Sequence, residues 1–282
     1  SLVVHVLWSR WTWYLCRETR ARVESMGASS TTPASVVARA SVRVRARTSL
    51  VNRFSSSFAG SGVVVRDEGR VIVVTCAHVA RCAGRRNALC VEFHDGATVR
   101  GRVAGVHADL DLAVVHLEEE EGRERARAWS LVVDDAEDAR AGEKVVAAGT
   151  PQGYARAVAF ARGVRGERDG VSRGRVLGTH GGTHAMHDAT VLSGQSGGPL
   201  CRAEAPGRLF GVHSFGDAFY GGARDVAVMA RNVRDIEIFE KGVDPDAYET
   251  KRVNEMIFAS SDAALRALAP ELTAKERASW IF

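Results

Sequence analysis

The sequence lacks any apolar run that approaches the roughly 18 residues needed by a helix that crosses a membrane. Residues 2–8 are apolar, but this run is short and His5 interrupts it. We therefore expect no membrane span. Disorder along the whole chain is also excluded, because hydrophobic residues make up 45% of the 282 residues and charged residues only 26%.

Cysteine is scarce, and its spacing does not suggest metal binding. The chain has five cysteines, an odd number, so at least one thiol has no partner within the chain. No Cys-x-x-Cys pair of the kind that binds zinc occurs. We expect free thiols in a reducing compartment, which favours an intracellular or organellar location over secretion. The five are Cys16, Cys76, Cys82, Cys90 and Cys201.

Acidic residues are absent between residues 26 and 58, a stretch rich in serine, alanine, threonine and arginine. This composition is typical of a transit peptide for a chloroplast or mitochondrion. The alternative is that residues 35–47 already belong to folded structure. We treat residues 1–33 as an amino-terminal extension that is disordered or serves in targeting, and we expect the folded domain to begin at residue 34.

The net charge of +4 is modest. The arginine-rich amino-terminal third has neither interleaved aromatic residues nor a basic recognition element, so we expect no nucleic-acid partner. Binding of an anionic surface through this segment is a weaker alternative. No feature of the sequence supports an oligomer, although none excludes one.

Short β-branched runs separated by turn residues dominate the sequence between residues 42 and 117. The Asp-Gly pair at residues 95–96 is typical of a hairpin turn between two of them. Six such runs predict one closed antiparallel barrel, barrel one, over about residues 34–117. The runs are Val42–Ala46, Gly62–Val65, Val71–Thr75, Leu89–Phe93, Thr98–Val106 and Leu112–Leu117.

A second set of six runs predicts barrel two over residues 142–230. Between the barrels, an acidic run followed by arginines indicates a solvated linker or exposed helix over residues 118–141. The pattern becomes helical from residue 231, with a helical extension over residues 241–282. The fold class is thus all-β, with two six-stranded antiparallel β-barrels and C-terminal helices. The second set of runs is Lys144–Gly149, Ala157–Gly163, Ala189–Leu192, Leu200–Arg202, Arg208–His213 and Asp225–Met229.

The strongest chemical signal is the segment Gly194-Gln195-Ser196-Gly197-Gly198-Pro199. Acyl transfer from an amide needs an activated hydroxyl and backbone N–H groups directed at the developing oxyanion. Small residues around Ser196 let the main chain turn tightly, so the N–H groups of Gly194 and Ser196 can form an oxyanion hole. Taken alone, the segment could also be a plain glycine-rich turn.

Two further segments supply the partners that a serine nucleophile needs. Thr75-Cys76-Ala77-His78-Val79 ends an apolar strand and gives His78 a fixed position as general base. Asp111 precedes another apolar strand and can orient the imidazole, with Asp109 as the alternative or as a turn residue. The order His78, Asp111, Ser196 is that of chymotrypsin-like enzymes. We predict a serine endopeptidase that forms an acyl-enzyme and needs no cofactor.

The sequence resembles the HtrA/Deg branch of the trypsin-like serine proteases over about residues 34–238, with the segments around His78 and Ser196 carrying most of the resemblance. The resemblance implies the chymotrypsin fold, a His78–Asp111–Ser196 triad, polypeptide substrates and a role in protein quality control. The matching segments are Ser35-Val36-Val37, Gly60–Val65 with Thr75–Val79, Asp111–Val114, Gly149–Gly153 and Asp188–Leu200.

The chain also departs from this family. About 44 residues follow the matching region, fewer than a peptide-binding PDZ domain needs, so we expect the protease domain without one. Gln195 stands where the family often has asparagine, and Leu192-Ser193 replaces its usual Asn-Pro. The resemblance therefore does not define the resting shape of the oxyanion loop.

In this fold the primary specificity pocket forms from residues just before Ser196 and from the strand that contains residues 210–216. We expect Thr190, Val191, His213, Ser214 and Phe215 to bind substrate. No aspartate occupies residues 190–193, which disfavours arginine and lysine at the cleavage site, and Val191 favours small or medium apolar side chains. His213 indicates acidic or amide side chains as the second choice, unless it is a core histidine.

Three histidines, His180, His184 and His187, lie in a glycine-rich stretch that we interpret as a mobile loop near the active site. We expect no metal site there, because no clear scaffold fixes the geometry. A different class of function also stays open. The same fold can serve as a holding or binding module for unfolded or partner proteins with an idle triad, because fold does not determine function.

Overall fold

The computed structural model describes residues 32–46, 59–136, 138–151, 170–216, 224–243 and 251–281. The chain divides into two units, residues 1–32 and residues 33–282, and the helices and strands given below all belong to the second. Within the described ranges, no helix combines the length and the apolar character that crossing a membrane demands.

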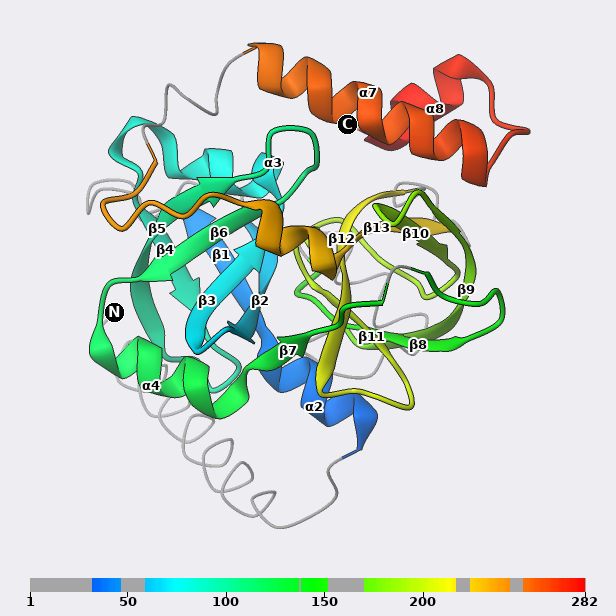
Figure 1. Ribbon diagram of the computed structural model, residues 1–282. Coiled ribbons are helices and arrows are strands. Elements are labelled where there is room, and N and C mark those ends of the chain that lie inside the picture. Colours follow the sequence, from blue (N-terminus) through cyan, green and yellow to red (C-terminus); the bar gives the residue numbers. More distant parts are fainter. Residues whose placement is uncertain are drawn as a thin grey trace, which may run out of the picture. The chain divides into compact units, whose positions relative to one another are not determined.

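The first half of the unit forms a closed barrel of six antiparallel strands (Figure 1). Around the barrel the strands follow one another in the order β1, β4, β5, β6, β3 and β2, and β2 pairs again with β1 to close the ring. Closure leaves no unpaired edge on this sheet. The strands are β1 (Ser41–Ala46), β2 (Ala59–Asp67), β3 (Arg70–Thr75), β4 (Leu89–Glu92), β5 (Thr98–Val106) and β6 (Ala113–Leu117).

The second half forms another ring of six antiparallel strands, which closes where β12 pairs with β13. A short strand, β7 (Leu131–Val133), pairs in parallel with both β2 and β12 and so joins the two barrels. The all-β fold with two barrels is therefore confirmed. The remaining strands are β8 (Lys144–Ala147), β9 (Ser172–His180), β10 (His184–His187), β11 (Pro199–Arg202), β12 (Arg208–Gly216) and β13 (Asp225–Met229).

Apolar runs build the interior of barrel one. Val63, Val64 and Val65 of β2 are all fully buried, because this strand has the barrel core on one side and packed neighbours on the other. The helix α4 (Glu120–Trp129) contacts β2, β3 and β6, and Ala126 is buried on its inner face. At the predicted hairpin, Gly96 has φ of +87°, a left-handed conformation that glycine adopts without strain.

The C-terminal helices pack on barrel two. Helix α7 contacts β9, and α8 contacts β12. One apolar cluster joins Leu265 and Ala269, at the end of α7, with Phe215 and Val226 of the barrel. The predicted C-terminal helices are α7 (Lys251–Leu268) and α8 (Ala274–Ile281); the other helices of the described residues are α2 (Pro33–Ala40), α3 (Ala77–Ala80), and the 3₁₀ helices η2 (Arg81–Arg86) and η3 (Ala230–Asp235).

The predicted strand over residues 189–192 is wrong, because these residues form no strand. The glycine-rich segment 180–184, interpreted as a loop, is the turn between two strands that were not predicted: β9 ends at His180 and β10 begins at His184. Arginines and glycines interrupt the apolar pattern of β9, and two histidines bound β10, so neither resembles a typical strand in sequence. Residues 118–141 contain α4, which agrees with the exposed-helix interpretation of this segment, and also the short strand β7, which was not predicted. The predicted strand over residues 157–163 lies outside the described residues.

Candidate active site

Strand pairing brings His78 and Asp111 together. His78 lies in α3, just after β3 ends at Thr75, and Asp111 lies two residues before β6 begins at Ala113. Because Thr75 and Ala113 are partners in the ladder, these two strand ends are adjacent. The Asp111 Oδ1 accepts a hydrogen bond from the His78 backbone N–H at 2.9 Å, and Oδ2 lies 2.6 Å from His78 Nδ1.

The Asp111 carboxylate is buried and held from a second side. Its side chain accepts a hydrogen bond of 2.6 Å from the hydroxyl of Ser214, which belongs to β12 of barrel two. Burial alone would raise the pKa of Asp111, but the charge of His78 and the hydrogen bonds from His78 and Ser214 outweigh it and lower that pKa. An ionised carboxylate only accepts hydrogen bonds, so Nδ1 of His78 carries a proton and Nε2 is the acceptor in the neutral ring.

The loop that carries Ser196 forms backbone hydrogen bonds with a strand of each barrel. The Ser61 N–H of β2 donates to the Ser196 carbonyl at 2.8 Å, and the Gly197 N–H donates to the His213 carbonyl at 2.8 Å. Gly197 has φ of +88°, and a Cβ at this position would overlap the Ser61 carbonyl oxygen and the Thr75 hydroxyl. Glycine is therefore required at residue 197 for the two barrels to approach one another here.

Hydrogen bonds also define the turn before Ser196. The Gln195 N–H donates to the Leu192 carbonyl at 2.9 Å, and the Gln195 side-chain oxygen accepts from the Leu192 N–H at 2.8 Å. The Ser61 hydroxyl donates to the Gly194 carbonyl at 2.9 Å. Gly194 has φ of +93°, and within the described ranges the N–H groups of Gly194 and Ser196 have no hydrogen-bond partner. Both N–H groups are thus available to an incoming acceptor.

Ser196 and the helix that carries His78 lie close together around Gly60. A Cβ placed on Gly60 would meet the Val79 side chain at 2.5 Å and the Ser196 carbonyl oxygen at 3.2 Å. The Ser196 hydroxyl, however, makes no hydrogen bond to His78 or to any other described group. In enzymes without substrate, such a bond is often long and forms fully only in the complex.

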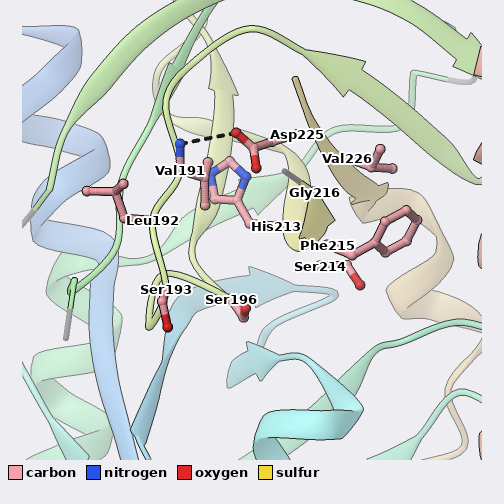
Figure 2. Close-up of a pocket in the computed structure, with 10 residues that line it drawn as sticks. All are labelled: Val191, Leu192, Ser193, Ser196, His213, Ser214, Phe215, Gly216, Asp225 and Val226. Atoms are coloured by element: carbon pink, nitrogen blue, oxygen red, sulfur yellow. Dashed lines mark hydrogen bonds between the residues drawn. The ribbon is translucent and has the colours of Figure 1, made fainter. Parts of the chain in front are cut away.

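A pocket of about 40 Å³ opens beside Ser196 (Figure 2). Of the predicted substrate-binding residues, Val191, His213, Ser214 and Phe215 line it. Thr190 is not among its lining residues; the Thr190 carbonyl instead accepts a hydrogen bond from Ser172 at 2.7 Å. The other residues that line the pocket are Leu192, Ser193, Gly216, Val226 and, unforeseen from the sequence, Asp225.

Two fully buried histidines lie at this pocket, His213 in its lining and His187 next to His213. The rings of His187 and His213 are 5.0 Å apart, and none of their four ring nitrogens has a hydrogen-bond partner within the described structure. Burial lowers the pKa of His187 to about 3. Burial, and then the neighbouring His187, lowers the pKa of His213 well below its ordinary value. Both rings are therefore neutral at neutral pH.

The three histidines considered as metal ligands do not form a metal-binding group in the described structure. His180 ends β9, and His184 and His187 bound β10. The group with suitable spacing there is instead Cys76 with His78 and Asp111. Cys76 donates a hydrogen bond from its thiol to the His213 carbonyl, and burial raises the pKa of that thiol. Cys76, Cys82 and Cys201 are free thiols, and Cys16 lies outside the described residues.

Relatives of this chain are serine proteases. It is 30% identical to the serine protease Do-like HtrA of Bacillus subtilis over 165 residues. This aligned stretch covers 57% of this chain and 34% of that protein. It is 32% identical over 168 residues to the serine protease HTRA4 of Homo sapiens, which is 58% of this chain and 31% of that protein. The chain thus spans about a third of the length of these curated relatives.

Solved structures support the fold. Deg5 superposes with a TM-score of 0.51 at 24% identity, over 72% of this chain and 89% of the other. The HtrA-type protease AlgW, solved with a decapeptide, superposes with a TM-score of 0.51 at 20% identity, over 74% of this chain and 66% of the AlgW chain. A family profile described as trypsin-like peptidase domain matches residues 60–212, which is more than half of the chain. The chain therefore belongs to the family of trypsin-like peptidase domains, and HtrA serine proteases are among its relatives.

Proposed function

We propose that this protein is a serine endopeptidase whose catalytic triad is Ser196, His78 and Asp111. Ser196 attacks the carbonyl carbon of a peptide bond while Nε2 of His78 takes the hydroxyl proton. His78 then returns this proton to the leaving amine, and water hydrolyses the acyl-enzyme by the same steps in reverse. The observation that carries the proposal is the buried Asp111 carboxylate, which holds the His78 ring at 2.6 Å and its backbone at 2.9 Å.

The oxyanion of the tetrahedral intermediate binds to the N–H groups of Gly194 and Ser196. The unpaired state of both groups within the described residues supports this role. Fixed N–H donors stabilise the developing charge without reorganisation during the reaction. Gln195 keeps the turn in place through its bonds to Leu192 and to the Gly170 carbonyl, the latter 2.7 Å long.

Substrate side chains enter the pocket beside Ser196. Val191, His213, Ser214 and Phe215 form its walls, and Thr190 supports the Val191 wall through its bond to Ser172. The substrates are polypeptides, and a role in protein quality control follows from the resemblance to the HtrA proteases.

The first test is covalent labelling by a fluorophosphonate, which needs the nucleophile, the base and the oxyanion hole together. We expect the wild-type protein to be labelled on Ser196 and Ser196→Ala not to be labelled. Casein hydrolysis by Ser196→Ala should fall by about 10⁴-fold or more. Cleavage by Ser196→Ala at the wild-type rate would exclude the proposal. Absence of labelling in the wild type, together with binding of unfolded protein, would favour the idle binding module.

A further inference from the structure

Ser61 of barrel one makes contacts that the proposed triad does not explain. It lies in β2 and is fully buried. Its backbone N–H donates to the Ser196 carbonyl at 2.8 Å, and its own carbonyl accepts a hydrogen bond of 2.6 Å from the Thr75 hydroxyl. The backbone of Ser61 is therefore held on both sides, and this fixes the place from which its side chain starts.

The Ser61 hydroxyl bridges two further segments. It accepts a hydrogen bond of 2.8 Å from the Thr150 N–H, which follows β8, and donates one of 2.9 Å to the Gly194 carbonyl. A serine hydroxyl has a single proton to donate. Because the Thr150 N–H can only donate, the hydroxyl proton is left for the Gly194 carbonyl. The direction of this chain of hydrogen bonds, from Thr150 through Ser61 to Gly194, is thereby determined.

The Gly194 carbonyl belongs to a tight turn. The Gln195 N–H donates to the Leu192 carbonyl at 2.9 Å, so residues 192–195 form a four-residue turn. Its third residue, Gly194, has φ of +93°, whereas its second residue, Ser193, has no positive φ. This combination is typical of a type II turn. The peptide between Ser193 and Gly194 carries the Gly194 N–H, one of the two proposed oxyanion donors, so the turn sets the direction of that donor.

Two hydrogen bonds from Ser61 tie the two proposed donor residues to the barrel that carries His78. The Ser61 hydroxyl binds the Gly194 carbonyl, and the Ser61 N–H binds the Ser196 carbonyl. The bond between Gln195 and Leu192 lies within the turn and moves with it. A single residue of barrel one therefore sets the position of both Gly194 and Ser196 relative to His78.

We infer that Ser61 is a positioning residue of the oxyanion hole. Through the Gly194 carbonyl, its hydroxyl keeps the Gly194 N–H beside the Ser196 N–H, where the carbonyl oxygen of the substrate becomes an oxyanion. Ser61 is buried and touches no substrate, so it acts entirely through Gly194 and Ser196. Such donors stabilise charge best when the surrounding structure fixes them in advance. This inference rests on the proposed endopeptidase function.

Ser61→Ala leaves the Thr150 N–H and the Gly194 carbonyl without this partner. We expect kcat for a peptide substrate to fall by about tenfold or more, which is less than the roughly 10²–10³-fold loss on removing an oxyanion donor outright. KM should stay near its wild-type value, because the developing charge is absent from the bound substrate. Ser61→Cys keeps nearly the same shape with a weaker donor, and its kcat should lie between those of the wild type and Ser61→Ala.

Ser41→Ala is the matched control. Ser41 belongs to the neighbouring strand β1 and is 1% exposed, and its hydroxyl has no hydrogen-bond partner within the part of the chain that the structure describes. This variant therefore removes a buried serine hydroxyl from the same barrel without removing a hydrogen bond. It should keep the wild-type kcat.

A peptidyl trifluoromethyl ketone with ¹³C at its ketone carbon reports on the oxyanion itself. Ser196 Oγ bonds to that carbon, the hydroxyl proton passes to Nε2 of His78, and the ketone oxygen becomes the oxyanion of a hemiketal. We expect Ser61→Ala to raise the pKa of the hemiketal hydroxyl in a ¹³C NMR titration, and to weaken inhibition by about the factor by which kcat falls. In the Ser196→Ala background, adding Ser61→Ala should change substrate binding by calorimetry much less.

The outcomes separate this inference from the proposed function. A wild type that cleaves no peptide and forms no hemiketal would overturn the proposed function. If the wild type forms the hemiketal and Ser61→Ala leaves kcat and the hemiketal pKa unchanged, this inference alone is overturned. It is also overturned if KM and substrate binding weaken as much as kcat while the hemiketal pKa stays the same, because Ser61 then only supports the fold. Should Ser61→Ala not fold, Ser61→Cys is judged by the same criteria.

Discussion

Single hydrogen bonds between the barrels control the geometry at His78. The Ser214 hydroxyl of barrel two donates to the Asp111 carboxylate of barrel one, so each barrel supplies part of the group that orients the imidazole. The Cys76 thiol and the Gly197 N–H both donate to the His213 carbonyl, the residue before Ser214. A small displacement of β12 would therefore be transmitted to Asp111.

Ser214→Ala tests this dependence. The variant loses a donor to a buried carboxylate, an interaction worth about 1.5–3 kcal/mol, so we expect kcat to fall by about tenfold or more. Because the backbone of Ser214 is unchanged, KM should change much less. Ser279→Ala, on the exposed side of α8, is the control and should behave as the wild type. If kcat stayed at the wild-type value, or if KM changed by as large a factor as kcat, Ser214 would not act by positioning Asp111.

The residues of the proposed triad could be predicted because each lies in a short, local pattern. Asp225 could not be predicted as a pocket residue. It meets Val191 only because β13 pairs with β12 and β10, and these strands are distant from one another in the sequence. Thr190 shows the opposite error. It precedes a wall residue, but it is absent from the pocket lining, and its carbonyl instead accepts a hydrogen bond from the Ser172 hydroxyl.

Predictability differs between elements for a related reason. β2, β3 and β6 contain consecutive valines and isoleucines with both faces buried, so their sequences identify them as strands. In β9 the exposed Arg173 and Arg175 flank the half-buried Gly174, and pairing with β8 and β10 supplies the stability that the composition of this strand does not. Such a strand is defined by its neighbours, as expected where context outweighs propensity.

Helix α7 supports one wall of the pocket from outside. Its Leu265 is fully buried against the cluster that contains Phe215 and Val226, both of which line the pocket. We expect Leu265→Ala to lower the free energy of unfolding by about 2–5 kcal/mol, because it leaves a cavity. The wall should also loosen, so that KM for small peptides rises.

Arg266→Ala is the matched control for this element. Its side chain is exposed and pairs with Asp262 on the surface, so it should cost at most about 1 kcal/mol. Urea unfolding and peptide kinetics on both variants provide the measurement. A Leu265→Ala variant that lost stability but kept the wild-type KM would show that the helices stabilise the barrel without shaping the pocket.

At the scale of the whole molecule, the buried histidines of barrel two couple folding to pH. Burial lowers the pKa of His184 to about 4 and that of His187 to about 3, and His213 is lowered as well. In the unfolded chain each titrates near pH 6.5. Between about pH 6.5 and pH 4 the unfolded chain thus binds protons that the folded chain does not, and the free energy of unfolding falls as the pH falls. Each histidine contributes a slope of up to about 1.4 kcal/mol per pH unit.

His187→Leu isolates one of these contributions. Urea unfolding at pH 7.5 gives the packing effect of the substitution, and the change between pH 7.5 and pH 5 gives the proton effect. Because wild-type His187 stays neutral when folded but is mostly protonated at pH 5 when unfolded, the variant should lose about 2 kcal/mol less than the wild type over this interval. Equal losses in both proteins would mean that the folded chain takes up the proton at His187, and that this ring is not excluded from water as its burial indicates.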